Sequence, residues 1–202
     1  ALGGVVSIIT RDGGETFEAS ATMGAGANGY ATGTARASGP IDGVGAFSVM
    51  ASRLDGGESD NGAKRDLTTA SGSLKFDIGD SVRGRIFGRI ADGELQRFPD
   101  DSGGEGLAAI RAKERAEDLT ALIGATASAD LTDDWTIKFD VSYFDQEKNV
   151  VSPGVAPGLR DPFGIPASQT EASIERARGA IVNQINVSPT LVLSAGVDVE
   201  VE

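Results

Sequence analysis

The chain of 202 residues contains neither cysteine nor histidine. Without cysteine there is no disulfide framework and no thiolate metal site, and without histidine the commonest general base and metal ligand is missing. Catalysis of the Ser-His-Asp or Cys-His type is therefore excluded within this sequence. Paired carboxylates of the kind that glycosidases use remain available. We expect a protein that is not an enzyme.

Basic residues and long apolar runs are also in short supply. The net charge is −12, from 18 basic and 30 acidic residues, so nucleic acid is a poor partner for the chain. No stretch approaches the roughly 18 consecutive apolar residues of a transmembrane helix. A membrane is still open as a location, because the strands of a β-barrel carry only a weak alternating signal.

What the sequence does contain is alternation of apolar and polar residues with a period of two, which predicts β-strands. The clearest case is "DWTIKFDVSYFDQE", where Trp135, Ile137, Phe139, Val141 and Tyr143 share one face. The pattern predicts about nine strands, longer than those of most globular sheets and close to the length of a tilted membrane-spanning strand. The predicted strands are 15–25, 29–38, 45–54, 67–77, 80–93, 119–129, 134–147, 173–187 and 189–202.

The connections between these strands alternate in length after a short first loop at 26–29. Four are tight, at 39–43, 77–80, 130–134 and 186–190, and three between them are long, at 55–66, 95–116 and 149–172. This alternation is typical of an up-and-down barrel with short turns at one rim and long loops at the other. A Greek-key sandwich would not keep its long loops at one rim. Within the second long loop, the composition of 106–118 favours a short helix.

The apolar stripe that runs from Trp135 to Tyr143 has two interpretations. It can be the inner face of a soluble sandwich, or a lipid-facing stripe with Trp and Tyr near its ends, as in the aromatic girdles of membrane barrels. The stripe spans roughly 27 Å at about 3.3 Å per residue. A tilt of about 40° reduces its height to roughly 20 Å, near the apolar band of an outer-membrane barrel.

Charged residues on the opposite faces favour the barrel. Arg83, Arg85 and Arg89 share one face of a strand, and Lys138 and Asp140 share one face of another. In a soluble sandwich these residues would form the solvated side, and in a barrel they would line a wet lumen. An arginine on the lipid side at mid-bilayer costs about 2–4 kcal/mol, and the apolar stripes contain none. We therefore expect an antiparallel, all-β, up-and-down transmembrane β-barrel.

The stretch "ALGGVVSIITRDGG" at the start of the chain resembles the end of the plug domain of TonB-dependent outer-membrane receptors. In that family a segment of the form Ala-x-Gly-Gly-Val-x-x-Ile-Ile-Thr closes the plug and leads into the first barrel strand. Ser7 stands where the family often has Asn. The matching residues here are Ala1, Gly3, Gly4, Val5, Ile8, Ile9 and Thr10.

This resemblance implies that residues 1–14 end a plug domain and that residues 15–202 are the first part of a barrel wall. The parent protein would then be a gated importer with a barrel of roughly 22 strands, in the outer membrane of a Gram-negative cell. Its partners would be outer-membrane lipid, the TonB protein and a scarce ligand such as a siderophore–iron chelate or cobalamin. The order of short and long loops is most similar to the cobalamin and small-siderophore receptors. We expect the chain to be an excerpt of such a receptor.

Cobalamin receptors carry an Asp-rich calcium site in an early extracellular loop, and the resemblance suggests where to look for one here. The loop "DGGESDNGAKRD" offers Asp55, Glu58, Asp60 and Asp66 as oxygen ligands for Ca²⁺. The clustered Asp-x-Asp pattern of the family is missing. An acidic, solvated loop without a metal is the simpler interpretation, and no other cofactor is expected.

Two other classes of protein stay open at this point. A smaller outer-membrane barrel, such as a porin or a structural protein, would account for the strands and loops but not for the plug-like opening. A soluble, secreted β-sandwich that binds a ligand or uses paired loop carboxylates would have long loops at both rims. Its charges would fall without regard to a lipid belt.

Overall fold

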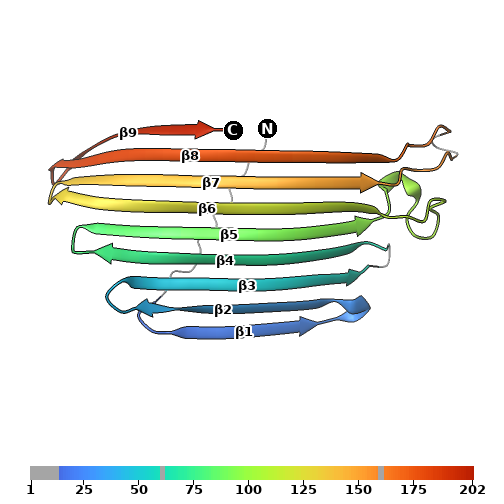
Figure 1. The fold of residues 1–202 in the computed structure, drawn as a ribbon, viewed down its shortest axis with the longest axis horizontal. Helices are drawn as coiled ribbons and strands as arrows, with labels where there is room; N and C mark the ends of the chain where they lie inside the picture. Colours follow the sequence, from blue (N-terminus) through green and yellow to red (C-terminus); the bar gives the residue numbers. More distant parts are fainter. Residues whose placement is uncertain (1–13, 60–61, 159–161) are drawn as a thin grey trace.

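The computed structural model describes residues 14–59, 62–158 and 162–202, and these residues form one antiparallel sheet. Each strand pairs with the next strand along the chain, so the order in the sheet is the order in the sequence (Figure 1). The predicted all-β class and strand number are confirmed. The strands are β1 (Glu18–Ala25), β2 (Ala31–Ile41), β3 (Gly45–Glu58), β4 (Lys64–Ile78), β5 (Val82–Arg97), β6 (Glu114–Thr132), β7 (Trp135–Ser152), β8 (Ser168–Ser188) and β9 (Leu191–Val201).

The two rims of the sheet differ, with the tight turns at one rim and the longer connections at the other. The predicted long loop at 55–66 is wrong, because β3 and β4 extend into it and leave only 59–63 between them. The turns β2–β3, β4–β5, β6–β7 and β8–β9 are tight and lie at one rim, on the left in Figure 1. The other rim holds the connections β1–β2, β3–β4, β5–β6 and β7–β8, of which the last two are the longest in the chain. We call these the short-turn rim and the long-loop rim. Their alternation follows from a meander in which every connection returns the chain to the neighbouring position.

The predicted strand ends at the long-loop rim are wrong, because the strands run further than the alternation shows. β5 continues to Arg97, β6 begins at Glu114 and β7 continues to Ser152. The predicted helix at 106–118 is also wrong, since 114–118 belong to β6 and 107–113 are irregular. Pairing with β5 and β7 stabilises these polar residues as strand and overrides their local helical preference.

The end of β3 is shaped by a β-bulge opposite β4, between Asp55 and Glu58. Gly57 lies in the bulge with a φ of 66°, which favours glycine. A Cβ at this position would lie 2.5 Å from the carbonyl oxygen of Asn28, in the short 3₁₀ turn η1 (Ala27–Gly29). The bulge therefore brings the end of β3 against the β1–β2 connection.

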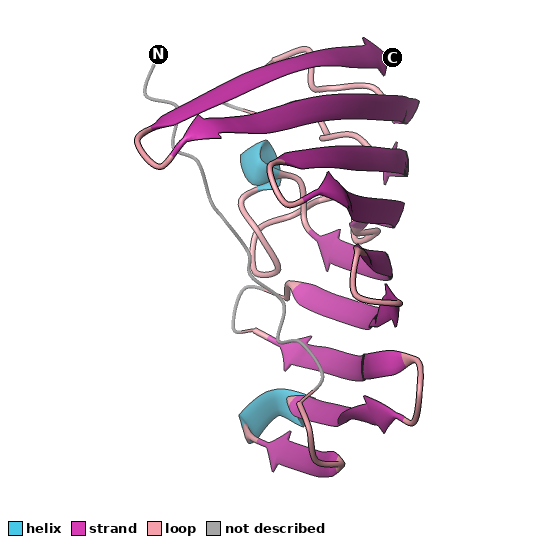
Figure 2. Cartoon of the chain, turned by 90° about the vertical axis from the view of Figure 1, so that its left-hand side faces the viewer, coloured by secondary structure: helices cyan, strands magenta, loops and turns pink. Residues whose placement is uncertain are grey.

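The sheet is a single curved layer that is open at both edges, β1 and β9 (Figure 2). It is not closed into a barrel, and no second sheet packs on it within the described residues. Burial is correspondingly slight: the buried apolar residues are Phe98 and Ala108, both beside the long-loop rim. No described helix is long and apolar enough to cross a membrane.

Candidate functional site

The register of the sheet collects the apolar residues of all nine strands on one face. Cross-strand partners point to the same side of a sheet, so a row of partners can be followed from one edge to the other. One such row passes through Ala37, Gly88 and Tyr143 and reaches Val201 on the edge strand β9. We define the apolar belt as every second residue, first and last included, in 17–25, 31–41, 45–51, 70–78, 82–90, 119–129, 135–143, 177–185 and 193–201.

The apolar belt contains no charged residue on any of the nine strands. Its one strongly polar side chain is Asn183, whose amide oxygen accepts a hydrogen bond from the Trp135 indole N–H at 3.3 Å. The belt is also uncovered: Val141 is 54% exposed and Val197 is 68% exposed. An apolar surface of this extent marks contact with a partner or a membrane.

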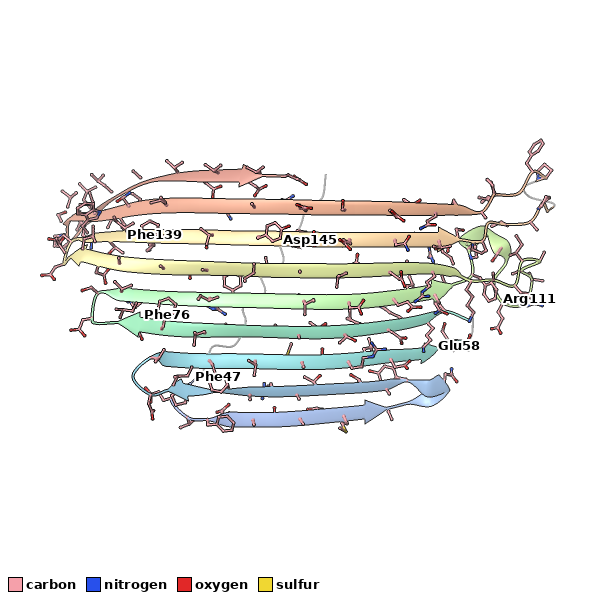
Figure 3. All side chains as sticks on the ribbon, viewed as in Figure 1. Phe47, Glu58, Phe76, Arg111, Phe139 and Asp145 are labelled. Atoms are coloured by element: carbon pink, nitrogen blue, oxygen red, sulfur yellow. The ribbon has the colours of Figure 1, made fainter. Side chains whose placement is uncertain are left out.

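Aromatic side chains lie toward the borders of the belt. Phe17 and Phe47 form a ring pair with centroids 6.4 Å apart, near the short-turn rim. Figure 3 shows Phe47, Phe76 and Phe139 on the same face of the sheet. Of the two predicted girdle residues, Trp135 begins the belt on β7 and Tyr143 ends it. Their role at a membrane interface stays a prediction.

Beyond the belt, toward the long-loop rim, the same face of the sheet becomes charged. Asp145 follows Tyr143 on this face, and Asp92 follows Ile90. Figure 3 shows Asp145 on the side that carries Phe139. We define the charged band as Arg53, Asp55, Lys64, Asp66, Asp92, Glu94, Arg115, Glu117, Asp145, Glu147, Glu171 and Glu175.

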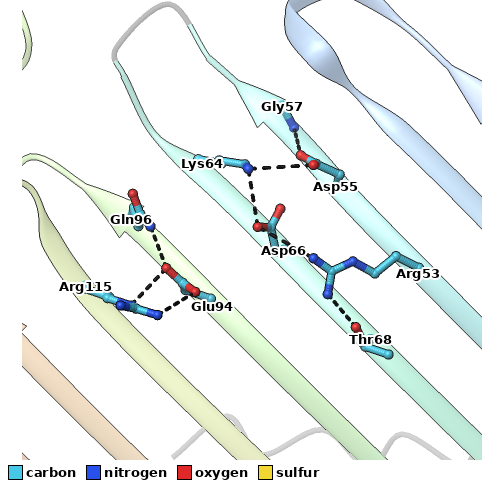
Figure 4. A network of polar contacts seen from close by, with 9 residues as sticks. All are labelled: Arg53, Asp55, Gly57, Lys64, Asp66, Thr68, Glu94, Gln96 and Arg115. Atoms are coloured by element: carbon cyan, nitrogen blue, oxygen red, sulfur yellow. Dashed lines mark hydrogen bonds and ion pairs between the residues drawn. The ribbon is translucent and has the colours of Figure 1, made fainter.

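Cross-strand ion pairs connect the charged band (Figure 4). Lys64 lies between two carboxylates, 3.6 Å from Asp55 and 3.4 Å from Asp66. Arg53 donates a 2.5 Å hydrogen bond to the Thr68 hydroxyl and lies 3.8 Å from Asp66. On the next pair of strands, Arg115 lies 2.9 Å from Glu94 and 2.8 Å from Glu117.

These contacts shift the ionisation of the band in the direction that keeps it charged. The pKa of Asp55 is lowered, chiefly by the hydrogen bond from the Gly57 N–H and then by the charge of Lys64. The pKa of Glu94 is lowered by hydrogen bonds from Gln96 and Arg115. The pKa of Lys64 is raised by Asp55 and Asp66. The contacts of Asp55, Glu94 and Lys64 therefore favour the charged form of these three side chains.

The predicted calcium ligands fall partly in this band. Asp55 and Asp66 are direct cross-strand partners, with Lys64 in contact with both carboxylates. Glu58 forms an ion pair with Lys113 from the β5–β6 connection. Asp60 lies outside the described residues. The described part of the chain contains no group of three or more acidic side chains arranged to hold a metal ion. A calcium site stays a prediction that depends on Asp60.

The other face of the sheet carries the residues predicted to line a lumen. Arg83 forms a 2.7 Å ion pair with Asp130, which also accepts a 2.7 Å hydrogen bond from Thr136. Lys138 donates to the Gln184 side chain at 3.2 Å. Other residues of this polar face are Arg85, which lies over the Phe87 ring at 5.7 Å, together with Arg89 and Asp140.

The residues of the plug-like motif, Gly3, Gly4, Val5, Ile8, Ile9 and Thr10, lie outside the described residues. Sequence reasoning also missed part of the site. Glu94, Arg115 and Glu117 had been assigned to strand ends or loops, and the ion pairs among them appear only once β5 and β6 are placed in register. The available signal is the alternation of charge over Lys113, Glu114 and Arg115, which the composition of 106–118 hides by favouring a helix.

Comparison with protein-family models and with curated proteins finds no match to this chain. The resemblance to TonB-dependent receptors therefore depends on the short motif at 1–10 and on the arrangement of strands, loops and faces.

Proposed function

We propose that the nine strands are consecutive strands in the wall of a TonB-dependent outer-membrane receptor, which imports a scarce ligand such as a siderophore–iron chelate or cobalamin. In this proposal the chain has a transport role and no catalytic role. The wall is larger than nine strands, with roughly 22 in total, and the open edges of β1 and β9 pair with further strands of the same wall.

The observation that carries the proposal is the uncharged, exposed belt across all nine strands, with a polar face behind it. A water-soluble sheet would leave this apolar area unprotected, which favours aggregation. Lipid on the belt side and water on the polar side satisfy both faces at once. The confinement of long loops to one rim supports the same arrangement, since outer-membrane barrels have short periplasmic turns and longer extracellular loops.

The two alternative classes, a smaller outer-membrane barrel and a soluble β-sandwich, each leave one feature of the chain unexplained. A smaller porin or structural barrel has the same belt and the same loop pattern, but it leaves the motif at 1–10 without a role. A soluble β-sandwich requires a second sheet over the apolar face, and none is present among the described residues.

The first test is the location of the complete gene product in a Gram-negative cell. We expect it in the outer-membrane fraction, with gel migration that changes on heating, as is typical of intact barrels. Recovery from the periplasm or the medium would contradict both membrane interpretations.

The second test separates a receptor from a porin. Cells that carry the gene product are given radiolabelled cyanocobalamin or ⁵⁵Fe-loaded siderophores, with and without a functional TonB protein. Uptake that requires TonB supports the receptor. Diffusion of small solutes that is independent of TonB supports the porin instead.

A further inference from the structure

The turn that joins β1 to β2 contains an Asn-Gly pair and is closed by a 3.0 Å hydrogen bond from the Tyr30 N–H to the Ala27 carbonyl. Asn28 has a φ of 57° and a ψ of 27°, and Gly29 has a φ of 81°. Positive φ at both central positions defines a type I′ turn, for which Asn-Gly is a preferred sequence. We infer that Asn28 is a site of spontaneous deamidation, and that its isoaspartyl product separates the turn from the bulge at the end of β3. This inference does not depend on the proposed function.

Deamidation at Asn28 requires no reactant other than water. The backbone nitrogen of Gly29 attacks Cγ of the Asn28 side chain, the Cγ–Nδ2 bond breaks, and ammonia leaves with the proton from the Gly29 N–H. The product is a succinimide ring in which this nitrogen is bonded to both carbonyl carbons of residue 28. Water then opens the ring. Cleavage of the bond to Cγ gives aspartate, whereas cleavage of the bond to the backbone carbonyl carbon gives isoaspartate.

The surroundings of the turn favour this reaction at Asn28. Both residues of the pair are exposed, and a Cβ added to Gly29 would have no atom within 4 Å, so water and the attacking nitrogen are unhindered. Ring closure needs a ψ of about −120° at Asn28, which is the value of a type II′ turn. Rotation of the Asn28–Gly29 peptide produces this turn while the φ of Asn28 stays positive. Gly29 tolerates both turns, because glycine adopts positive and negative φ about equally well.

The other described asparagines lie in less reactive positions. Asn149, Asn183 and Asn186 belong to β7 and β8, where pairing with neighbouring strands holds the backbone extended. Valine follows Asn149 and Asn186, and glutamine follows Asn183, so a side chain hinders the attacking nitrogen. A second Asn-Gly pair occurs at 61–62, where Asn61 lies outside the described residues. We therefore expect deamidation at Asn28 to be faster than at the three strand positions.

The atoms that deamidation changes are atoms that pack against the β3 bulge. A Cβ at Gly57 would lie 2.5 Å from the Asn28 carbonyl oxygen and 2.7 Å from the Tyr30 nitrogen, so the turn and the bulge are in close contact. In isoaspartate the chain runs through the former side chain, which lengthens the turn by one carbon atom, and the Asn28 carbonyl becomes a free carboxylate. A second carboxylate is already present, because Asp55 accepts a 3.1 Å hydrogen bond from the Gly57 N–H (Figure 4). Repulsion between the two like charges then opposes the contact.

The test follows the complete gene product, as purified from cells, during storage in mildly alkaline buffer, which accelerates deamidation. Peptide mass spectrometry locates the modified asparagine, since trypsin releases Asn28 and Asn61 on different peptides. Labelling by protein L-isoaspartate methyltransferase measures the isoaspartate. We expect deamidation at Asn28 to be at least about tenfold faster than at Asn183, because glycine leaves the attacking nitrogen uncovered. In the control variant Asn28→Gly, which keeps a residue suited to positive φ, this peptide stays unmodified.

Amide hydrogen exchange measures the effect on the bulge. We expect exchange at 55–58 to be at least about threefold faster in the isoaspartyl form than in fresh protein. Fresh Asn28→Asp carries the added charge on an unaltered backbone, and we expect a smaller increase from it. An Asn28 side chain that stays intact as long as Asn183 would overturn the whole inference. Isoaspartate at Asn28 with unchanged exchange at 55–58 would support the modification site and overturn the separation of turn and bulge.

Discussion

The strands β5 to β8 are built of two halves that share one hydrogen-bond ladder and differ in their side chains. Near the short-turn rim an uncharged belt backs onto a polar face, whereas near the long-loop rim acidic and basic residues occupy the face that continues the belt. The ladder runs through both halves of the β5–β6 and β7–β8 pairs without a register shift, and in β6–β7 the register shifts only beside the tight turn, between Asp130 and Thr132. Backbone pairing therefore builds the sheet in both halves, and the side chains decide what surrounds each half.

The largest expected effect comes from placing a charge in the belt. We expect Leu74→Arg to destabilise the membrane-inserted protein by about 2–4 kcal/mol, because Leu74 lies at mid-belt on β4. Ser73→Arg, one residue away on the polar face, is the matched control and costs little. The measurement is equilibrium unfolding in lipid vesicles. Equal costs for the two variants would mean that the two faces meet the same environment.

The second-largest expected effect is a loss of stability from overpacking, which we expect in the belt half and not in the long-loop half. The Phe76 ring lies over Gly84 in the belt, where an added Cβ would be 2.3 Å from the nearest ring atom. We expect Gly84→Ala to cost about 1–3 kcal/mol through overpacking. Gly93→Ala, in the long-loop half of the same strand, is the control, since its Cβ would make ordinary contacts from 3.5 Å outward. Equilibrium unfolding of both variants measures the difference, and a larger cost at Gly93 would contradict this account.

Acidification probes the charged band without a substitution. The folded-state pKa values of Asp55 and Glu94 lie below their ordinary values of 3.8 and 4.5. Their contribution to stability is therefore complete above the ordinary pKa and is lost as the pH falls through the folded-state value. We expect amide hydrogen exchange, corrected for its intrinsic pH dependence, to increase at 53–58 and 114–118 between about pH 6 and pH 3. Exchange at 70–76 in the belt stays unchanged.

The smallest expected effect is a change in proteolysis of the β5–β6 connection, which an ion pair joins to the end of β3. Lys113 forms an ion pair with Glu58 and lies over the Phe98 ring at 5.7 Å. We expect Lys113→Gln to increase proteolysis of this connection about two- to fivefold, since an exposed pair contributes little. Arg111→Gln is the control, because Arg111 bonds to the Glu105 carbonyl within the same connection. No change in proteolysis relative to the control would mean that the pair does not hold the loop.

Sequence reasoning placed the belt half of the sheet well and the charged half poorly. The bounds of β9 at Leu191–Val201 and the start of β7 at Trp135 match the alternation, because apolar and polar faces differ sharply there. The extension of β7 to Ser152 was missed because the residues beyond Tyr143 show no period of two: Phe144, Val150 and Val151 are apolar and fall on both faces among polar neighbours, while pairing continues.

The connections within the charged band were also beyond a linear reading of the chain. Glu94 and Arg115 meet across the β5–β6 connection, and only the register of the two strands brings them together. Polar-face residues such as Arg83 and Lys138 were assigned correctly to one side of their strands by period alone. Their contact with a lumen, like the plug-like motif, stays a prediction.

The strictly sequential order of the strands has a consequence for assembly. Each strand finds its partner within a hairpin, so the alignment of β8 is inherited from β7, and that of β7 from β6. Every pairing joins strands that are neighbours in the chain, and we therefore expect the sheet to grow from a hairpin outward, one neighbour at a time. We therefore expect removal of an edge hairpin to leave the alignment of the remaining strands intact. A sheet of this topology can therefore gain or lose strands at its edges in steps of one hairpin.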